Sequence, residues 1–150
     1  EPKQPIHLKV EINCMEHFSV LPMVRVPFEV DNKWFNGKCD ILTYQLDELI
    51  GTKMRALYQR RKGRDLFDLY KALTVAPIDE TNVIECYLKY MDFVVDHIPT
   101  YKEFIINMDE KMKDDEFLGD TAGLLRVGDG FHPESAYDLV RTRLIDRLIK

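Results

Sequence analysis

Apolar and polar positions change their spacing once along this chain, from alternation to helical periodicity. Residues 8–14 alternate strictly, which predicts a half-buried strand with Leu8, Val10, Ile12 and Cys14 on its covered face. Residues 18–30 are rich in valine and phenylalanine but contain two prolines, as short or edge strands do. A turn at 32–37 and a strand at 38–42 follow. We expect these strands to form a small, largely antiparallel sheet.

From residue 45 onward the spacing is helical almost to the end of the chain. Start and stop signals predict further helices at 79–98, 101–113 and 115–125, a turn at 127–131 and a last helix from Pro133. The expected fold class is therefore α+β, a sheet followed by a helical bundle. We expect residues 1–44 to form a β-rich part and residues 45–150 a helical domain, packed together as one unit.

One basic run stands out against an acidic background. Six cations lie between Lys53 and Arg64 with no acid among them, and Asp65 and Asp68 follow, whereas the formal net charge of all 150 residues is −5. The positive potential is therefore local, which argues against general binding of duplex nucleic acid. A single phosphate-bearing ligand or the end of a nucleic acid fits the pattern better.

Helical phasing divides this run into two sets. At about 100° per residue, Lys53 and Arg60 share the stripe of Leu46, Leu49, Ile50 and Leu57, whereas Arg55 and Lys62 face solvent. If the helix continues past Gly63, Arg64 and Asp68 rejoin this stripe. A lysine on an apolar stripe must snorkel, pair with an acid or meet an anion. The inward cations either form a structural network with the two aspartates or bind an anion such as phosphate.

Other residues carry weaker signals. Tyr58, Phe67 and Tyr70 lie among the cations and could stack on a base, but aromatic residues at helical spacing more often pack in a core. Three cysteines and four scattered histidines have neither zinc-ligand nor disulfide spacing, so we expect buried, reduced thiols. No apolar stretch reaches spanning length, which favours a cytoplasmic protein without a membrane partner.

Three segments together resemble a known family. These are Lys-Val-Glu-Ile-Asn at 9–13, residues 49–53, and Arg-Arg-Lys-Gly-Arg-Asp-Leu-Phe-Asp-Leu at 60–69. They are similar to the AbiEii/AbiGii nucleotidyltransferase toxins of prokaryotic toxin–antitoxin and abortive-infection systems. The resemblance implies a partial nucleotidyltransferase-like fold, transfer of a nucleoside monophosphate from a nucleoside triphosphate to an acceptor hydroxyl, and a cognate antitoxin. It also implies magnesium, with tRNA or another RNA as the candidate acceptor.

The resemblance assigns roles to residues of the basic run. Lys53, which opens a Lys-x-x-Ala-x-x-x-Arg pattern completed by Arg60, would meet nucleotide phosphates, and Arg60 and Arg64 would bind phosphate with it. Asp65 and Asp68 belong to an Arg-Asp-x-x-Asp motif, where the acids would orient the lysine or the acceptor. Both assignments suit nucleotidyl transfer, in which cations neutralise charge on the phosphates.

The metal site implied by the resemblance is incomplete. Glu11 would be the acid on the strand beside the catalytic metal, but the family's Gly-Ser turn and Asp-x-Asp pair are missing. Glu29 and Asp31 would share a strand face, yet no Gly-Ser turn precedes them, so they are poor substitutes.

Two accounts explain that departure. The chain would be the C-terminal part of a longer enzyme and inactive alone, or a family member that lost catalysis. The other class of function is a non-catalytic helical module that binds nucleotide, RNA or the antitoxin.

Overall fold

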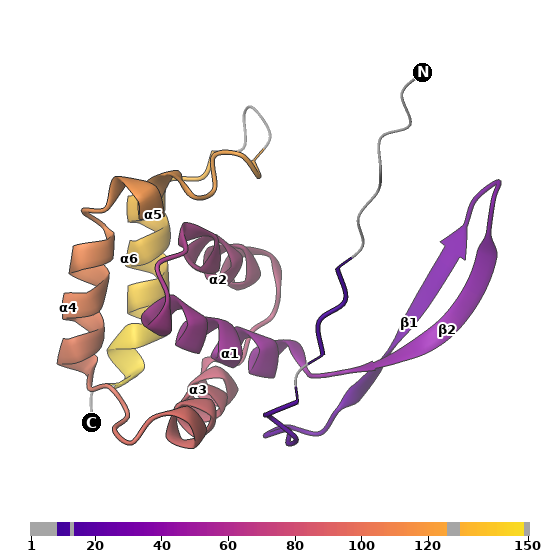
Figure 1. The fold of residues 1–150 in the computed structure, drawn as a ribbon, viewed down its shortest axis with the longest axis horizontal. Coiled ribbons are helices and arrows are strands. Elements are labelled where there is room, and N and C mark those ends of the chain that lie inside the picture. Colours follow the sequence, from indigo (N-terminus) through magenta and orange to yellow (C-terminus); the bar gives the residue numbers. More distant parts are fainter. Residues whose placement is uncertain (1–8, 13, 126–129, 149–150) are drawn as a thin grey trace.

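The computed structural model describes residues 9–12, 14–125 and 130–148. In that part of the chain a two-stranded antiparallel sheet is followed by six helices, which confirms the small α+β fold (Figure 1). Of the expected turn at 127–131, residues 127–129 lie outside the described residues. The elements are β1 (Val24–Asp31), β2 (Asn36–Thr43), α1 (Leu46–Gln59), α2 (Gly63–Val75), α3 (Glu80–Val94), α4 (Tyr101–Lys111), α5 (Asp115–Gly119), α6 (Pro133–Arg143) and a 3₁₀ turn (Ile145–Leu148).

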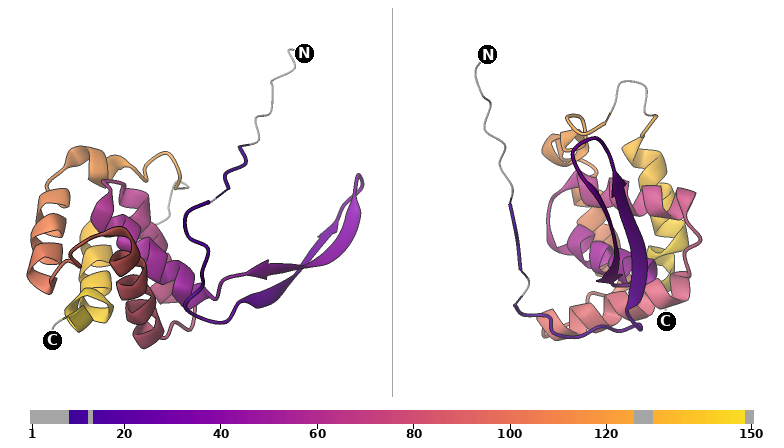
Figure 2. Two further views of the ribbon diagram at one scale, coloured as in Figure 1. Left: turned by 60° about the horizontal axis from the view of Figure 1, so that its bottom comes forward. Right: turned by 90° about the vertical axis from the view of Figure 1, so that its right-hand side faces the viewer.

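The two strands form a hairpin that extends away from the helices (Figure 1 and the left view of Figure 2). Its turn is closed by Asn32, whose Oδ1 accepts the backbone N–H groups of Trp34 and Phe35 at 2.9 and 3.1 Å. The pairing register places Val26 opposite Ile41, on an apolar face that remains exposed. The strands expected within 18–30 and at 38–42 are thus β1 and β2.

The strand expected at 8–14 is wrong for the residues described there. Residues 9–12 and 14 form no strand, and the side chains of Val10 and Ile12 are 74% and 79% exposed. Leu8 and Asn13 lie outside the described residues. Alternation produces a strand only where a neighbouring strand supplies hydrogen bonds and an apolar surface. Among the described residues, β1 and β2 pair only with each other.

The core lies in the helical body, where α1 packs against α3 and α2 against α6. Gly51 permits the close approach of α1 and α3, because a Cβ at this position would lie 2.7 Å from the Cβ of Cys86. Asp79 caps α3 as expected, by accepting the N–H groups of Thr81 and Asn82. The helix ends at Val94, before the expected residue 98, because residues 95–99 connect it to α4. The most deeply buried large side chains include Met54, Leu57, Leu66, Leu69, Tyr87, Met91, Phe104 and Phe117.

The expected stripe on α1 is displaced around the helix. Its buried side contains Gly51 and Met54, whereas Leu46 and Leu49 are exposed. Lys53 therefore lies at the margin of the buried face and not within it. Ile50 and Leu57 are buried as expected, so the stripe is displaced only in part. The expectation left out Met54 and the small Gly51, which allows α3 to approach.

Two further expectations about exposure are corrected. Of the three thiols, only Cys86 is buried, and that burial raises its pKa to about 12, whereas Cys14 and Cys39 are exposed. Arg55 does not face solvent: it is largely buried, pairs with Glu16 and lies 5.4 Å from the ring of Tyr90. Every helix in the described part of the chain is too short or too polar to cross a membrane.

Candidate functional site

The corner between α1 and α2 brings four of the sequence-predicted residues together around one buried carboxylate. Asp65, in the first turn of α2, is completely buried. Arg60 donates to both of its oxygens, from Nε at 2.6 Å and from Nη2 at 2.7 Å. Lys53 Nζ lies 3.3 Å from Asp65 Oδ1 and 2.8 Å from Asp68 Oδ2. The two-point contact from Arg60 is the strongest form of this pairing.

The corner exists because the helix breaks between Gln59 and Gly63. Arg60 is extended and caps the C-terminus of α1, so its guanidinium can turn toward α2. Gly63 then starts α2 against the backbone of α5, where a Cβ would lie 2.1 Å from the carbonyl oxygen of Phe117. Arg64 and Asp68 consequently belong to the second helix, and they do not continue the stripe of α1.

The cations of this corner are paired but not enclosed. The side chains of Lys53, Arg60 and Asp68 are 31%, 51% and 45% exposed, respectively. The hydrogen bond to Asp65 raises the pKa of Arg60, against the opposing effect of partial burial. Since an ammonium has three donors and a guanidinium five, both groups retain hydrogen-bonding capacity toward solvent. The corner, which we call the Asp65 network (Lys53, Arg60, Asp65 and Asp68), could therefore bind an added anion.

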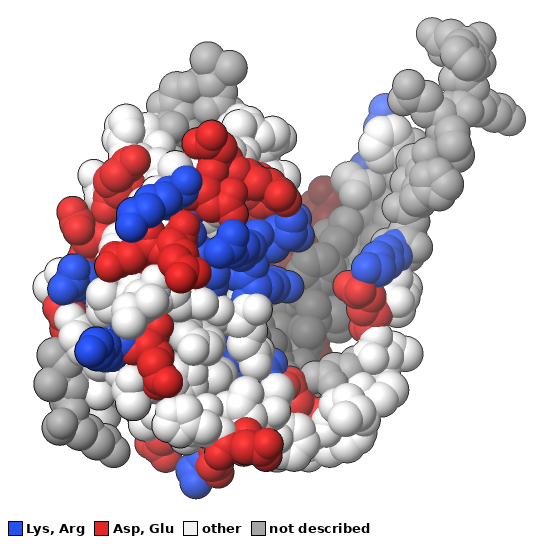
Figure 3. Space-filling model, turned by 60° about the vertical axis from the view of Figure 1, so that its left-hand side comes forward, with Lys and Arg blue, Asp and Glu red and all other residues white. Residues whose placement is uncertain are grey.

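The other cations of the basic run pair with acids around the network. Arg61 lies 3.1 Å from Asp114, and Lys62, which was expected to face solvent, is only partly exposed and lies 3.5 Å from Glu116. Arg64 reaches Asp120 only at 4.0 Å and is half exposed. Figure 3 shows basic side chains gathered beside acidic ones on one face of the helical body. Arg64 thus lies outside the Asp65 network, with much of its surface open.

Glu11 is not brought to the Asp65 network. Its carboxylate pairs with Lys9 at 2.5 Å, and both side chains are largely exposed. Across the described residues, no group of three or more histidine, cysteine, aspartate or glutamate side chains is arranged to hold a metal ion. By itself Glu11 does not fit a magnesium site, which needs several oxygen ligands.

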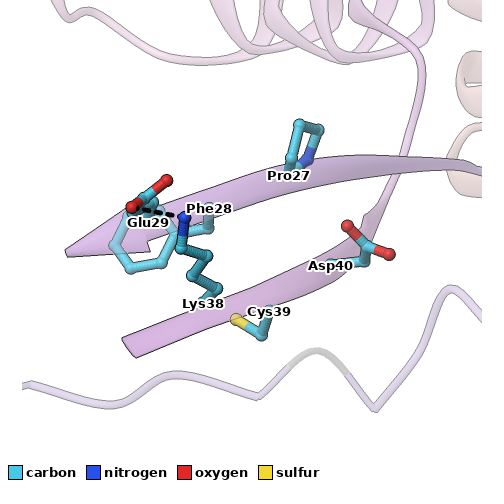
Figure 4. Close-up of a pocket in the computed structure, with 6 residues that line it drawn as sticks. All are labelled: Pro27, Phe28, Glu29, Lys38, Cys39 and Asp40. Carbon is cyan, nitrogen blue, oxygen red and sulfur yellow. Dashed lines mark ion pairs between the residues drawn. The ribbon is translucent and has the colours of Figure 1, made fainter. Parts of the chain in front are cut away.

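The hairpin carries a shallow hollow of about 520 Å³ that is separate from the network. It is lined by Pro27, Phe28, Glu29, Lys38, Cys39 and Asp40. Figure 4 shows the side chains of Glu29 and Lys38 directed toward each other, and their charged atoms are 2.7 Å apart. A single exposed ion pair of this kind has no catalytic geometry, and it occupies the carboxylate of Glu29.

Sequence reasoning missed two buried charges, one at each end of α1. Glu48 is completely buried and accepts from the N–H groups of Val20 and Leu21 at 2.8 and 3.0 Å and from Tyr90 Oη at 2.8 Å. In the sequence it resembles an ordinary acid in the first turn of a helix, which is usually exposed. Its partners are distant in sequence, so no local signal could have identified it.

Lys111 is the second missed residue. It is almost fully buried in α4 and donates to the carbonyl oxygens of Leu57, in a short contact, and of Tyr58, at 2.8 Å. Burial lowers its pKa to about 8. A cation at the C-terminal end of α1 satisfies carbonyl groups that have no partner within the helix. Lys111 thereby fixes the end of α1 from which Arg60 projects.

Comparison with known proteins identifies the family. A family model described as "Nucleotidyl transferase AbiEii toxin, Type IV TA system" matches residues 1–140. No curated protein and no solved structure matches the chain. The match includes the Asp65 network and both helices that form it, in agreement with the three segments noted in the sequence. The chain therefore belongs to the AbiEii family of nucleotidyltransferase toxins of type IV toxin–antitoxin systems.

Proposed function

We propose that the protein containing this chain transfers a nucleoside monophosphate from a nucleoside triphosphate to an acceptor hydroxyl, with RNA, for example tRNA, as acceptor. Family membership supports a nucleotidyltransferase-like toxin with a cognate antitoxin and a nucleotide substrate. The observation that carries the proposal is the Asp65 network. A buried carboxylate holds Lys53 and Arg60 in place while leaving part of each cation open to solvent.

In the proposed reaction, an acceptor oxygen forms a bond to the α-phosphorus, the bond to the bridging oxygen of pyrophosphate breaks, and the hydroxyl proton passes to a base. Lys53 and Arg60 would neutralise charge on the triphosphate, which lowers the barrier because the charge is redistributed in the transition state. Arg64 would supply a further phosphate contact. Asp65 is a positioning residue, and Asp68 would orient Lys53 or the acceptor.

The proposal assigns no chemical step to the residues that precede α1. Residues 1–44 would be the β-rich remainder of the nucleotidyltransferase core, and residues 45–150 the helical domain that binds phosphate. Glu11 would be one ligand of a magnesium site whose other ligands come from outside the described residues, so we assign no chemical step to it. We place the protein in the prokaryotic cytoplasm, where the triphosphate, the RNA and the antitoxin would meet.

Incubation of the full-length protein with labelled triphosphates and total RNA tests this function. Transfer should occur with at least one nucleotide and should be lost in Lys53→Met, whose melting temperature should stay close to that of the wild type. Lys89→Met is the matched control, because Lys89 is an exposed lysine on α3 outside the network. Absence of transfer with every nucleotide would contradict the proposal.

A non-catalytic binding module is the second candidate, and the partial exposure of Lys53 and Arg60 favours it, since an anion would bind there without any chemistry. In that case the chain would bind nucleotide, RNA or antitoxin in the presence of EDTA, and transfer would be absent from the full-length protein. A purely structural network is distinguished by stability, because Lys53→Met would then lower the melting temperature strongly without any ligand to lose.

A further inference from the structure

The outer face of α2 combines cations and aromatic rings in a way that the Asp65 network does not use. At about 100° per residue, Arg64 and Lys71 lie within about 20° of each other on this helix. Asp68 flanks this line on the side of the network, and Phe67 flanks it on the other side. One helix therefore presents the network, a line of two cations and an aromatic side chain in that order around its surface.

The aromatic side chain opens onto a small pocket. Phe67, Tyr70, Lys71, Gly130 and Phe131 line a cavity of about 160 Å³ between α2 and the residues that precede α6. The ring of Phe131 meets that of Phe67 edge-on, with the ring centres 5.1 Å apart, and lies 5.7 Å from the ring of Tyr70. Phe67 and Phe131 are only partly buried, so the aromatic lining is accessible from the surface.

The charges beside this pocket are available to an anion. Lys71 is exposed and makes no ion pair with any residue in the described ranges, and Arg64 reaches its acid only at 4.0 Å. The nearest acid around the helix, Asp68, is already paired with Lys53 at 2.8 Å. Aromatic side chains between cations are the elements that bind unpaired nucleotides, since bases stack on the rings and phosphates meet the charges.

We propose that this face of α2, the Phe67 pocket with Lys71 and Arg64, binds an unpaired nucleotide of a single-stranded nucleic acid. The base would enter the aromatic pocket, and the adjoining phosphates would follow the line from Lys71 to Arg64 toward the Asp65 network. A duplex would bind poorly, because its bases are stacked and cannot enter a pocket of this kind. The role of the bound strand as acceptor rests on the proposed function, whereas binding of the strand requires no nucleotidyl transfer.

Fluorescence anisotropy of a labelled single-stranded oligoribonucleotide, without any triphosphate, tests the proposal on the full-length protein. The single strand should bind more tightly than a duplex of the same sequence. Phe67→Leu keeps the apolar bulk but removes the stacking ring, and should weaken binding roughly tenfold. Lys71→Gln should weaken binding and reduce its salt dependence by about one phosphate contact.

Two matched variants on α3 act as controls. Lys89→Gln removes the same charge and Phe93→Leu the same ring from an exposed surface away from the pocket, so both should bind like the wild type. Circular dichroism melting of each variant establishes that it is folded, and cross-linking of a 4-thiouridine oligonucleotide should label residues 64–71.

Three results with the oligonucleotide would overturn the proposal. These are no binding of the single strand, equal loss in Lys71→Gln and Lys89→Gln, and unchanged binding in a folded Phe67→Leu. Equally tight binding of a free mononucleotide would also overturn it, because no strand would then be needed. Since no triphosphate is present, failure here is distinguishable from failure of nucleotidyl transfer, which the labelled-triphosphate assay reports separately.

Discussion

Replacement of Arg60 by methionine should destabilise the fold more than the same replacement of Lys53. Asp65 is completely buried, and Arg60 supplies two of its short hydrogen bonds, at 2.6 and 2.7 Å, whereas Lys53 contributes one at 3.3 Å. Removing one partner of a fully buried pair costs about 3–5 kcal/mol. Because Arg60 is half exposed and Lys53 remains, we expect a loss of about 2–3 kcal/mol.

The loss expected for Lys53→Met is smaller. Asp65 keeps both bonds from Arg60, and the partly exposed Asp68 is hydrated when its lysine is removed. Partly exposed pairs of this kind contribute less than about 1 kcal/mol. The two substitutions should therefore differ by roughly 2 kcal/mol, which corresponds to a difference in melting temperature of about 4–8 °C for a chain of this size.

Urea unfolding followed by circular dichroism at neutral pH measures both losses. Arg64→Met is the control, because its guanidinium only reaches Asp120 at 4.0 Å, and its free energy of unfolding should change by less than about 0.5 kcal/mol. A double-mutant cycle with Asp65→Asn should assign most of the coupling to Arg60. If Lys53→Met is as destabilising as Arg60→Met, the described division of roles within the network is wrong.

Three further substitutions test the supporting structure. Gly63→Ala should cost about 2–3 kcal/mol in urea unfolding, because its Cβ would lie 2.1 Å from a backbone oxygen, whereas Gly119→Ala, with open space around it, should cost nothing. Glu48→Gln should remove one of the two carboxylate oxygens that accept backbone N–H groups, and should cost about 1–2 kcal/mol. It should also speed limited proteolysis of the segment preceding β1. An unchanged cleavage rate would argue against this anchor. The pKa of Lys111 is lowered from 10.5 to about 8 in the folded state, so the unfolded chain binds the proton of Lys111 more tightly than the folded chain does. The stability of the wild type relative to Lys111→Met should therefore rise by up to about 3 kcal/mol as the pH rises between these two values. A difference in urea unfolding that does not change with pH would refute this.

Local signals predicted the elements whose partners are close in sequence. The hairpin turn at Asn32 and the capped start of α3 at Asp79 both depend on bonds within a few residues, and both are present in the structure. The strand expected around Val10 depended on a neighbour that no local pattern specifies. Its alternation was real, but among the described residues nothing pairs with it.

For the site too, contacts between residues close in sequence were predictable and distant ones were not. The Arg-Asp-x-x-Asp motif and the phasing of Lys53 and Arg60 indicated that these two cations and Asp65 could meet, and the structure brings them together, whereas Arg64 stays outside. Sequence could not show that Arg60 is the closer partner, because that depends on where α1 ends. Nor could it identify Lys111, whose contacts with the end of α1 join residues more than fifty positions apart.

The anchoring of the hairpin has a mechanical consequence. The segment that enters β1 is fastened to the start of α1 twice, through Glu48 and through Gln45, whose Nε2 donates to the carbonyl of Pro22 at 2.9 Å. The hairpin is thus held to α1 at its base, whereas its turn projects away from the helices. Trp34, the single tryptophan of the sequence, is in that turn and almost fully exposed. The wavelength of its fluorescence emission should therefore report whether a partner covers the turn of the hairpin.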